Sequence, residues 1–472
     1  MKRSFPLLRW ILPVVVVLPF GYRAAGWLFG SPEPTFQYDA KMSEQGKELF
    51  SHVWEPHDRL APLGDGLGPV FNGKSCVECH NQGGAGGGGS LAFNVTAFTI
   101  VPVISKPSFG ITDFEQTSHQ TPESRAGVVH AFSTSPEHRE SLANLSPRLD
   151  DVCRPKLADL LPNNSIPNCT IPPSIGVAAG VDVSHRNTPA LFGANLIDAI
   201  PDRLLIQIER EQRLRWGFSD ARTEAVPVGR ALRLANGRVG KFGWKAQIGT
   251  LPDFVRAACA NELGLGNPSQ PQPASLNNRS YSPPGIDLTD EQCDQITAFI
   301  ASLPRPIESV PASENEVAMV AAGKETFHSI GCADCHTPDV GNVKGIYSDL
   351  LIHSMGKTLV GGGSYGEPPA ELPEFPEGSG PNPSEWRTPP LWGVADCAPY
   401  LHDGRAETLE KAIELHGGQA QKSADRFQKL SQSSRMNLIA FLKTLRAPEV
   451  EPLPPSDTEE GQQDSLADAV NP

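Results

Sequence analysis

Two short stretches, Cys76-Val77-Glu78-Cys79-His80 and Cys332-Ala333-Asp334-Cys335-His336, decide how this sequence of 472 residues is interpreted. Both have the order Cys-x-x-Cys-His, in which an imidazole directly follows the second thiol. This order is the attachment pattern of c-type haem: the thiols reach the two vinyl groups of one porphyrin, and the imidazole binds its iron. A chance match to one such pentapeptide is uncommon, so two in one chain predict two covalently bound haems.

Structural zinc is the competing interpretation, because two Cys-x-x-Cys pairs are the usual ligands of a Cys₄ site. The two pairs lie in opposite halves of the chain, each is followed by a histidine, and each comes after a Gly-Lys-x-x-Phe helix start. These features favour haem. The haem interpretation assigns covalent attachment to four cysteines and proximal iron ligation to two histidines: Cys76, Cys79, Cys332, Cys335, His80 and His336.

Composition limits the class of protein. The length allows two or three domains. The 45 prolines and 44 glycines predict long ordered loops around modest helices, which is one way to wrap a large cofactor. The net charge of −14 argues against nucleic acid as a partner. It suits a basic redox partner, although an acidic surface is also typical of soluble proteins in general.

The N-terminus resembles a targeting segment. Basic residues precede an apolar run over residues 10–22, which is short for a membrane span and suits a signal peptide, with Ala24 and Gly26 as small residues near a cleavage site. We expect residues 1–30 to be a signal peptide or an uncleaved N-terminal anchor, since residues 27–29 extend the apolar stretch. Either predicts export to the periplasm or the outer face of the cytoplasmic membrane, with possible membrane association in the second case.

The cysteines outside the motifs suggest further chemistry. Two pairs are close enough in sequence for disulfides in an oxidising compartment, Cys153 with Cys169 and Cys259 with Cys293. Cys397 is left over, and we expect it to be a buried, inert thiol rather than a reactive one. Residues 449–472 are rich in Pro, Asp, Glu and Gln and are predicted to be a disordered acidic tail.

The chain consists of two related halves. Gly46–Phe50 matches Gly323–Phe327 ahead of each motif, and Leu288–Pro306 matches Leu430–Pro448 at a constant offset of 142 (430 − 288). The later segments have apolar residues at helical spacing and a proline stop. We therefore predict a mainly α protein with two cytochrome c-like helical domains, residues 38–310 and 311–448.

The first domain is the larger one because of a long insertion between His80 and Arg186. The insertion is rich in loop residues and is predicted to be partly β, with Phe93–Val103 as the clearest strand. The run Gly83–Gly89 is not preceded by a strand, so it is predicted to be a flexible loop beside the first haem rather than a dinucleotide-binding turn.

Several longer motifs together resemble one family. They are Gly68–Asn72, Phe242–Ala246, Trp386–Gly393, Pro399–Arg405 and Thr408–Gly418. The sequence is similar over about 41–448 to the di-haem oxidoreductases, relatives of the bacterial di-haem cytochrome c peroxidases that are also labelled thiol oxidoreductases. The resemblance implies a haem enzyme in which electrons move between two haems and which reduces peroxide or oxidises another substrate. A calcium ion between the domains would also suit the family, although no compact acidic loop points to it.

The resemblance also implies a sixth ligand for the second haem. In the related peroxidases this ligand, usually Met, follows the His of a Tyr-x-His-Asp-Gly stretch by fourteen residues, and that position here is His416. Met355, or His353 beside it, is the competing ligand. Bis-histidine ligation would give the second haem a lower potential than ligation by methionine, which makes a conventional cytochrome c peroxidase less suitable.

Candidate catalytic residues follow from the same motifs. We expect Arg387, His402 and Glu385 to act near the first haem as acid, base or polarising cation, although haem-propionate binding would equally explain the arginine. Further candidates for these roles are His185, Arg186 and His130, and candidates for a charge relay between the haems are Trp244, Trp386 and Trp392.

Three functions remain open at this stage. The first is a peroxidase-like enzyme that takes peroxide, a small substrate or a redox partner protein. The second is an electron-transfer cytochrome without catalysis. The third is a thiol oxidoreductase, which needs a reactive thiol that only Cys397 could supply.

Overall fold

The computed structural model describes residues 36–102, 125–136, 140, 179–217, 226–274, 281–362 and 380–450. Contacts divide the chain into two units, Met1–Thr35 and Phe36–Pro472, and the description below concerns the second. The predicted signal or anchor, the pair Cys153 and Cys169, and most of the predicted acidic tail lie outside the described residues.

Among the described residues, the first half carries two helices that frame its motif, four further α-helices and most of the strands. Its elements are α2 (Ala40–Ser51), β1 (Val70–Phe71), α3 (Cys76–Cys79), η1 (Leu91–Phe93), β2 (Val95–Pro102), β3 (Arg125–Val129), β4 (Phe132–Ser133), β5 (Ala179–Arg186), α5 (Ala194–Asp198), α6 (Asp202–Trp216), α7 (Leu251–Leu263) and α8 (Asp290–Ser302).

The second half is more helical. Its elements are β6 (Ile307–Glu308), α9 (Glu314–Ser329), η3 (Cys332–Asp334), β7 (Ile352–Ser354), β8 (Glu385–Arg387), η4 (Val394–Asp396), α10 (Leu409–Glu414), η5 (Gly418–Ala420), α11 (Gln421–Lys429), α12 (Gln432–Leu442) and β9 (Leu445–Arg446). Helices outweigh strands in the described residues, which confirms the mainly α prediction, while the division into two domains stays a prediction.

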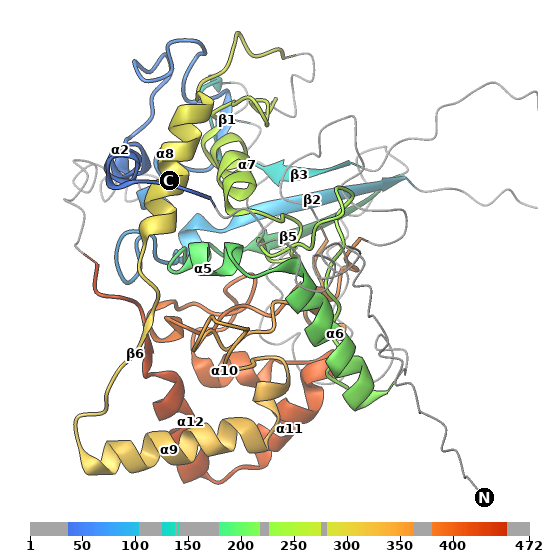
Figure 1. Ribbon diagram of the computed structural model, residues 1–472. Coiled ribbons are helices and arrows are strands. Elements are labelled where there is room, and N and C mark those ends of the chain that lie inside the picture. Colours follow the sequence, from blue (N-terminus) through green and yellow to red (C-terminus); the bar gives the residue numbers. More distant parts are fainter. Residues whose placement is uncertain are drawn as a thin grey trace, which may run out of the picture. The chain divides into compact units, whose positions relative to one another are not determined.

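The same helix crossing occurs in both halves. In Figure 1, α2 lies against α8 and α9 lies against α12. A Cβ on Gly46 would lie 1.8 Å from the Gln295 carbonyl oxygen, and one on Gly323 would lie 2.0 Å from the Asn437 carbonyl oxygen. These contact partners are also 142 residues apart (437 − 295), so the sequence repeat reflects a repeated close approach of two helices that only glycine permits.

Local sequence explains where these helices begin. The Thr289 hydroxyl accepts from the Gln292 backbone N–H, and the Gln292 side chain accepts from the backbone N–H of Thr289; Ser313 and Glu316 form the same capping box at α9. At α2, Asp39 accepts from the Met42 N–H. Each cap satisfies backbone donors that the first helical turn leaves unpaired.

Figure 1 shows a three-stranded antiparallel sheet of order β3-β2-β5. Val95, Ala97 and Arg186 of this sheet line the same cavity as the first motif. The strand predicted at Phe93–Val103 is confirmed as β2, which pairs with β5 from Val95–Arg186 to Pro102–Ala179. The sheet therefore places Arg186 next to the first motif's cavity, although 106 residues separate it from His80 (186 − 80).

The prediction of a Cys259–Cys293 disulfide is wrong for this structure, in which both residues are free thiols. Cys259 in α7 and Cys293 in α8 are buried in the main apolar core, with 2% and 0% of their surface exposed. In such surroundings each thiol packs as a small apolar group, and burial raises the pKa of Cys293 to about 12.

The run Gly83–Gly89 is also different from the flexible loop that was predicted. Gly83, Gly84 and Gly86 have positive φ angles, and a Cβ on Gly86 would lie 2.3 Å from Leu303. The glycines therefore fold a tight turn that packs against the core.

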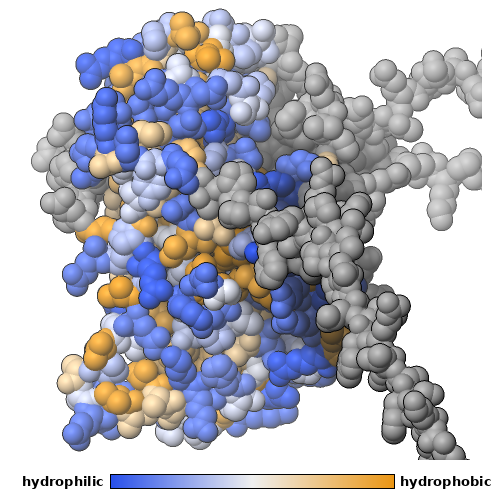
Figure 2. Space-filling view, in the orientation of Figure 1, coloured by the Kyte–Doolittle hydropathy of each residue, from blue (hydrophilic) through white to orange (hydrophobic). Residues whose placement is uncertain are grey.

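Within the described ranges no helix is both long enough and apolar enough to cross a membrane. On the face drawn in Figure 2, hydrophobic residues occur in small groups among hydrophilic ones.

Candidate functional site: two motif cavities with a shared wall

Both motif histidines are oriented by a backbone carbonyl. The Nδ1 of His80 lies 3.2 Å from the Gly87 oxygen, and the Nδ1 of His336 lies 2.9 Å from the Tyr347 oxygen. A carbonyl only accepts, so each Nδ1 carries the proton, and the Nε2 of His336 keeps a lone pair for a metal. The Pro189 carbonyl also interacts with the His80 ring. Burial lowers the pKa of both imidazoles to about 4, so both are neutral, as metal ligands must be.

His416 faces His336. Their ring centres are 6.5 Å apart, and the His416 Nδ1 lies 2.7 Å from the Ala412 carbonyl oxygen in α10. Two imidazoles on opposite sides of one metal ion, with bonds of about 2 Å each, have ring centres roughly 6 Å apart. The observed separation is therefore suitable for one iron between them.

A cavity of about 410 Å³ opens at the second motif and a cavity of about 130 Å³ at the first; we call them the Cys332 cavity and the Cys76 cavity. The volume of the Cys332 cavity is within the usual range for a bound cofactor. The volume of the Cys76 cavity is below that range, so the argument for haem at the first motif rests on its thiols and its histidine.

The two cavities share a wall. The residues that line both are Asn187, Thr188, Pro189, Leu191, Gly243, Trp244, Leu251 and Phe254. The indole Nε1 of Trp244 donates to the Asn187 carbonyl at 2.8 Å, which fixes the ring in this wall. Trp386 and Trp392 line the Cys332 cavity and are absent from the described lining of the other.

Arg387 is prepared for an anion in the Cys332 cavity. Its Nε donates to the Gly243 carbonyl at 2.9 Å, whereas its Nη1 is buried and meets no acceptor among the described residues. Burial lowers the pKa of the guanidinium to about 10, and no carboxylate offsets this effect. A buried positive charge without a partner is costly, and a bound anion would remove that cost. A carboxylate, such as a haem propionate, is an anion that a guanidinium binds well.

His402 stacks on Trp386, with ring centres 3.7 Å apart and an angle of 16° between the planes. The Lys245 ammonium lies 3.6 Å from the centre of the Trp386 ring and donates to the Asn382, Pro383 and Glu385 carbonyls. Burial lowers the pKa of both His402 and Lys245 well below their usual values. His402 is therefore a neutral imidazole beside the Cys332 cavity.

The other predicted acid and base residues have structural partners. Glu385 forms an ion pair with Arg230, at 2.8 Å and 3.0 Å, and it is not among the described residues that line either cavity. His130 contacts the Asn261 carbonyl at 2.9 Å and His185 contacts the Thr96 hydroxyl at 3.2 Å. These contacts do not favour an acid or base role.

Arg186 lines the Cys76 cavity, where it donates to the Gly362 carbonyl at 2.7 Å. Met355 lines the Cys332 cavity together with His416, so the structure brings both predicted sixth ligands to the same space.

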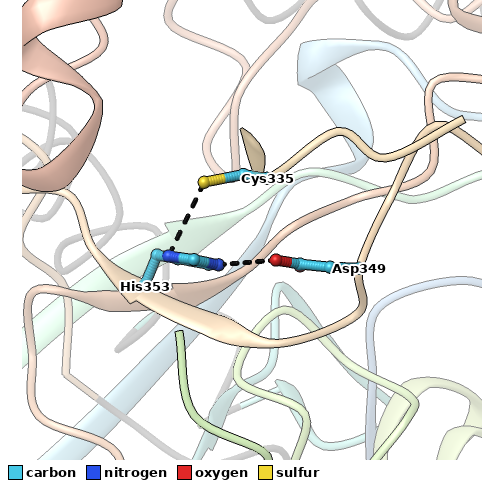
Figure 3. A group of neighbouring side chains, drawn as sticks. All are labelled: Cys335, Asp349 and His353. Atoms are coloured by element: carbon cyan, nitrogen blue, oxygen red, sulfur yellow. Dashed lines mark hydrogen bonds and ion pairs between the residues drawn. The ribbon is translucent and has the colours of Figure 1, made fainter. Parts of the chain in front are cut away.

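His353 belongs to a buried polar network (Figure 3). Its Nε2 lies 2.9 Å from the Asp349 carboxylate, its Nδ1 lies 2.8 Å from the Gln419 amide oxygen, and the Cys335 sulfur is 3.6 Å from the same Nδ1. Burial lowers the pKa of His353, but Cys335 and Asp349 raise it, and the net shift is well upward. Both ring nitrogens are engaged by oxygen acceptors, so His353 does not offer a free nitrogen to iron.

Sequence reasoning missed Asp349, Gln419 and Gln212 as parts of this network. Gln212 Nε2 donates to Asp349 at 2.7 Å from helix α6, a segment more than a hundred residues away in the sequence. The spacing of Asp349 and His353, four residues apart, was the one available signal, and it is common by chance.

Two such motifs opening on adjoining, largely apolar cavities define the site of a di-haem protein. A family model described as "Di-haem oxidoreductase, putative peroxidase" matches residues 176–445. This stretch is more than half of the chain, so the protein belongs to the di-haem oxidoreductase family, as the sequence motifs predicted.

Individual proteins are more distant. The gamma subunit of hydrazine synthase from Kuenenia stuttgartiensis is 27% identical over 148 residues, which cover 26% of this chain and 40% of that relative. The chain thus matches less than half of the length of this curated relative. A solved hydrazine synthase of the same organism gives a TM-score of 0.31 at 17% identity, covering 56% of this chain and 73% of that one. A MauG-like protein associated with microbial copper homeostasis gives 0.27 at 16% identity, covering 52% and 89%.

Proposed function

We propose that this chain is a c-type di-haem oxidoreductase with peroxidase-like activity. The observation that carries the proposal is the arrangement of two Cys-x-x-Cys-His motifs on cavities that share one wall, each motif with its histidine oriented by a backbone carbonyl. When bound, the haems supply the electron-transfer chemistry, and the substrate class is peroxide or an organic or protein substrate that is oxidised.

The chain's own residues have distinct tasks in this proposal. Cys76 and Cys79 would hold the first haem, and His80 would bind its iron. Cys332, Cys335 and His336 would hold the second haem, and His416 rather than Met355 would be the further residue that binds its iron. This choice is supported by the 6.5 Å separation of the His336 and His416 rings.

Two further residues act around the haems without binding iron. Arg387 compensates a negative charge in the Cys332 cavity through its unpaired Nη1. Trp244, whose ring is fixed in the shared wall, is the best placed of the described tryptophans to mediate electron exchange between the two cavities.

The proposal places the protein outside the bacterial cytoplasm, because c-type haem is attached there. A calcium ion remains an expectation from the family resemblance alone. The electron donor is expected to be a redox protein or a small molecule, and the acidic chain makes a basic partner suitable.

A purely electron-transferring cytochrome is the second candidate, because binding of the second iron by both His336 and His416 would leave peroxide no place at that haem. A thiol oxidoreductase has less support. The Cys397 thiol donates to the Gly393 carbonyl at 3.0 Å, and burial raises its pKa to about 12, so it is a poor nucleophile.

Optical and EPR spectra of the exported, haem-loaded protein test the proposal. We expect two haems per chain, one high-spin and one low-spin, with a spectral change at the high-spin haem on addition of hydrogen peroxide. Two low-spin haems that do not respond to peroxide would favour the electron-transfer protein, and fewer than two haems in a pyridine haemochrome assay would refute the di-haem assignment.

A further inference from the structure

The mouth of the Cys332 cavity carries basic side chains from two helices. Arg215 lies at the C-terminal end of α6, and Lys422 and Arg426 lie one turn apart in α11. All three side chains are exposed. Lys422 and Arg426 line the cavity, as does Trp216 next to Arg215. We call Arg215, Lys422 and Arg426 the basic rim.

The basic rim adjoins the second motif. Asp334, between the two cysteines of the motif, lies 3.4 Å from the Arg215 guanidinium. The Arg426 Nη1 donates to the Ile330 carbonyl at 3.2 Å. A Cβ on Gly331 would lie 3.1 Å from the Asp334 carboxylate and 3.3 Å from the Arg426 Nη1, so both groups flank this glycine. The rim therefore borders the segment that would hold the second haem.

The charges of the basic rim are only partly neutralised. Asp334 pairs with Arg215, whereas neither Lys422 nor Arg426 forms an ion pair with an acid among the residues that the structure describes. Asp425, the acidic residue of α11, accepts from another side chain of that helix. Three cations and one carboxylate leave a net charge of +2 (3 − 1). Because the whole chain carries −14, the rim is a local exception to its acidity.

Apolar surface adjoins these charges. Leu214 is 75% exposed, and the half-buried Trp216 ring has the Arg215 guanidinium 4.9 Å from its centre. Tryptophan and arginine are enriched at protein interfaces and among the residues that contribute most to binding. Interfaces between redox partners are small, so a short stretch of exposed apolar surface within a charged rim suits a transient complex.

We propose that the basic rim, together with Leu214 and Trp216, is the docking surface of an acidic redox protein that reduces the second haem. The docking rests on the proposed function, because it needs that haem. In the step one electron passes from the reduced partner to the haem, so the partner is oxidised as the haem is reduced, and no bond forms or breaks.

Local charge decides the sign of the partner. In a docked complex only charges within about 8 Å, the Debye length at physiological salt, act at full strength. The rim therefore favours an acidic partner, in place of the basic one that the net charge of the chain suggests. Opposite charges also accelerate the encounter, and salt reduces this acceleration.

The test uses the full-length, haem-loaded protein and an acidic [2Fe–2S] ferredoxin as the probe, whose potential is low enough to reduce a haem. Reduced ferredoxin is mixed with oxidised protein in a stopped-flow instrument, and the absorbance of the second haem is followed. The rate should fall about tenfold between about 20 and 200 mM salt.

Charge reversal at the rim should have the same effect. Lys422→Glu combined with Arg426→Glu should slow reduction by ferredoxin at low salt by about tenfold or more. An unchanged absorption spectrum and full reduction by dithionite, a small reductant, would show that the second haem of this variant is intact.

Lys429→Glu combined with Lys443→Glu is the matched control. Both lysines are exposed and neither is among the described residues that line the two cavities, so the charge change is equal but lies away from the rim. This variant should react nearly as fast as the unmodified protein.

Equal rates in the rim variant and the control variant would overturn the inference, and so would a rate of the unmodified protein that rises with salt. Rim-dependent binding to phosphatidylglycerol vesicles but not to ferredoxin, measured by sedimentation, would overturn it in favour of a membrane surface. A second motif that carries no haem would instead refute the proposed function, and the docking with it.

Discussion

At the scale of single residues, the two candidates for the sixth position of the second haem can be separated directly. His416→Ala should convert the second haem from low-spin to high-spin, because it removes the imidazole opposite His336. Met355→Ala should leave the spectrum unchanged, and it is the matched control because Met355 lines the same cavity. EPR of the oxidised protein measures the result, and the reverse pattern would assign Met355 as the ligand.

Asp287 gives a prediction about pH. Burial, with a smaller contribution from nearby Asp65, raises the pKa of Asp287 to about 6 against the opposing effect of the Gly66 and Gly266 N–H groups. A carboxyl group with a raised pKa favours folding when protonated, so its contribution is present below about pH 4 and is lost as pH rises to about 6.

The difference in free energy of unfolding between Asp287→Asn and the unmodified protein should therefore shift by about 1–3 kcal/mol in favour of the variant as pH rises from about 4 to 6. Urea unfolding at several pH values measures this difference. Glu325→Gln, at an exposed site, is the control and should show no such trend. A difference that does not change with pH would contradict the prediction.

The residues of the site differed in how far the sequence could reveal them. Cys76, His80 and their counterparts were visible because the Cys-x-x-Cys-His pattern occupies five consecutive positions. The network around His353 was not, since its hydrogen-bond partners Gln419, Asp349 and Gln212 come from distant segments whose proximity only the fold creates.

At the scale of elements, the helix crossings at Gly46 and Gly323 are the most constrained contacts. Gly46→Ala and Gly323→Ala should each lower the free energy of unfolding by about 1–3 kcal/mol or more, because the new methyl group would overlap a backbone carbonyl of the facing helix. Chemical denaturation measures the loss.

The two substitutions should also differ in their spectra. Gly323→Ala moves α9 against α12 and should disturb the second haem, whereas Gly46→Ala moves α2 against α8 and should disturb the first. Glu325→Ala, exposed in α9, is the control, with a change of less than about 0.5 kcal/mol. Unchanged stability in both glycine variants would show that the helices can separate without loss.

Elements with a strong local signal were predicted well. The framing helices have caps and apolar periodicity, and β2 is rich in β-branched residues, so these elements followed from the sequence. The Gly83–Gly89 turn and the free thiols of Cys259 and Cys293 did not, because both depend on what packs against them. Composition alone cannot distinguish a packed glycine turn from a loose one.

At the scale of the whole molecule, the shared wall predicts how the two haems communicate. When the protein is rapidly mixed with less than one equivalent of reductant, electrons should redistribute between the two haems. Trp244→Phe should slow this redistribution, because the indole stands between the cavities. Trp392→Phe is the control, because Trp392 lines the Cys332 cavity and is not among the described residues that line the Cys76 cavity. Stopped-flow absorbance measures the rate, and equal rates in both variants would exclude Trp244 as the route.

The overall arrangement was only partly accessible from sequence. The repeat predicted two similar halves, but the main apolar core combines residues of both, such as Phe50 and Leu205 with Ile346 and Trp392. Such mixing cannot be deduced from periodicity within one helix, since each apolar face is compatible with several neighbours.

The paired helix crossings have a consequence for the history of the chain. We infer that an ancestral unit of one crossing and one motif was copied within the gene, and that the contact between helix backbones was retained in both copies. The sheet lies between α2 and α8 in the sequence and supplies walls of the Cys76 cavity, so that part of the chain can vary while the helix crossing stays the same. Replacing loops between His80 and Arg186 is accordingly a way to change the substrate that this scaffold accepts.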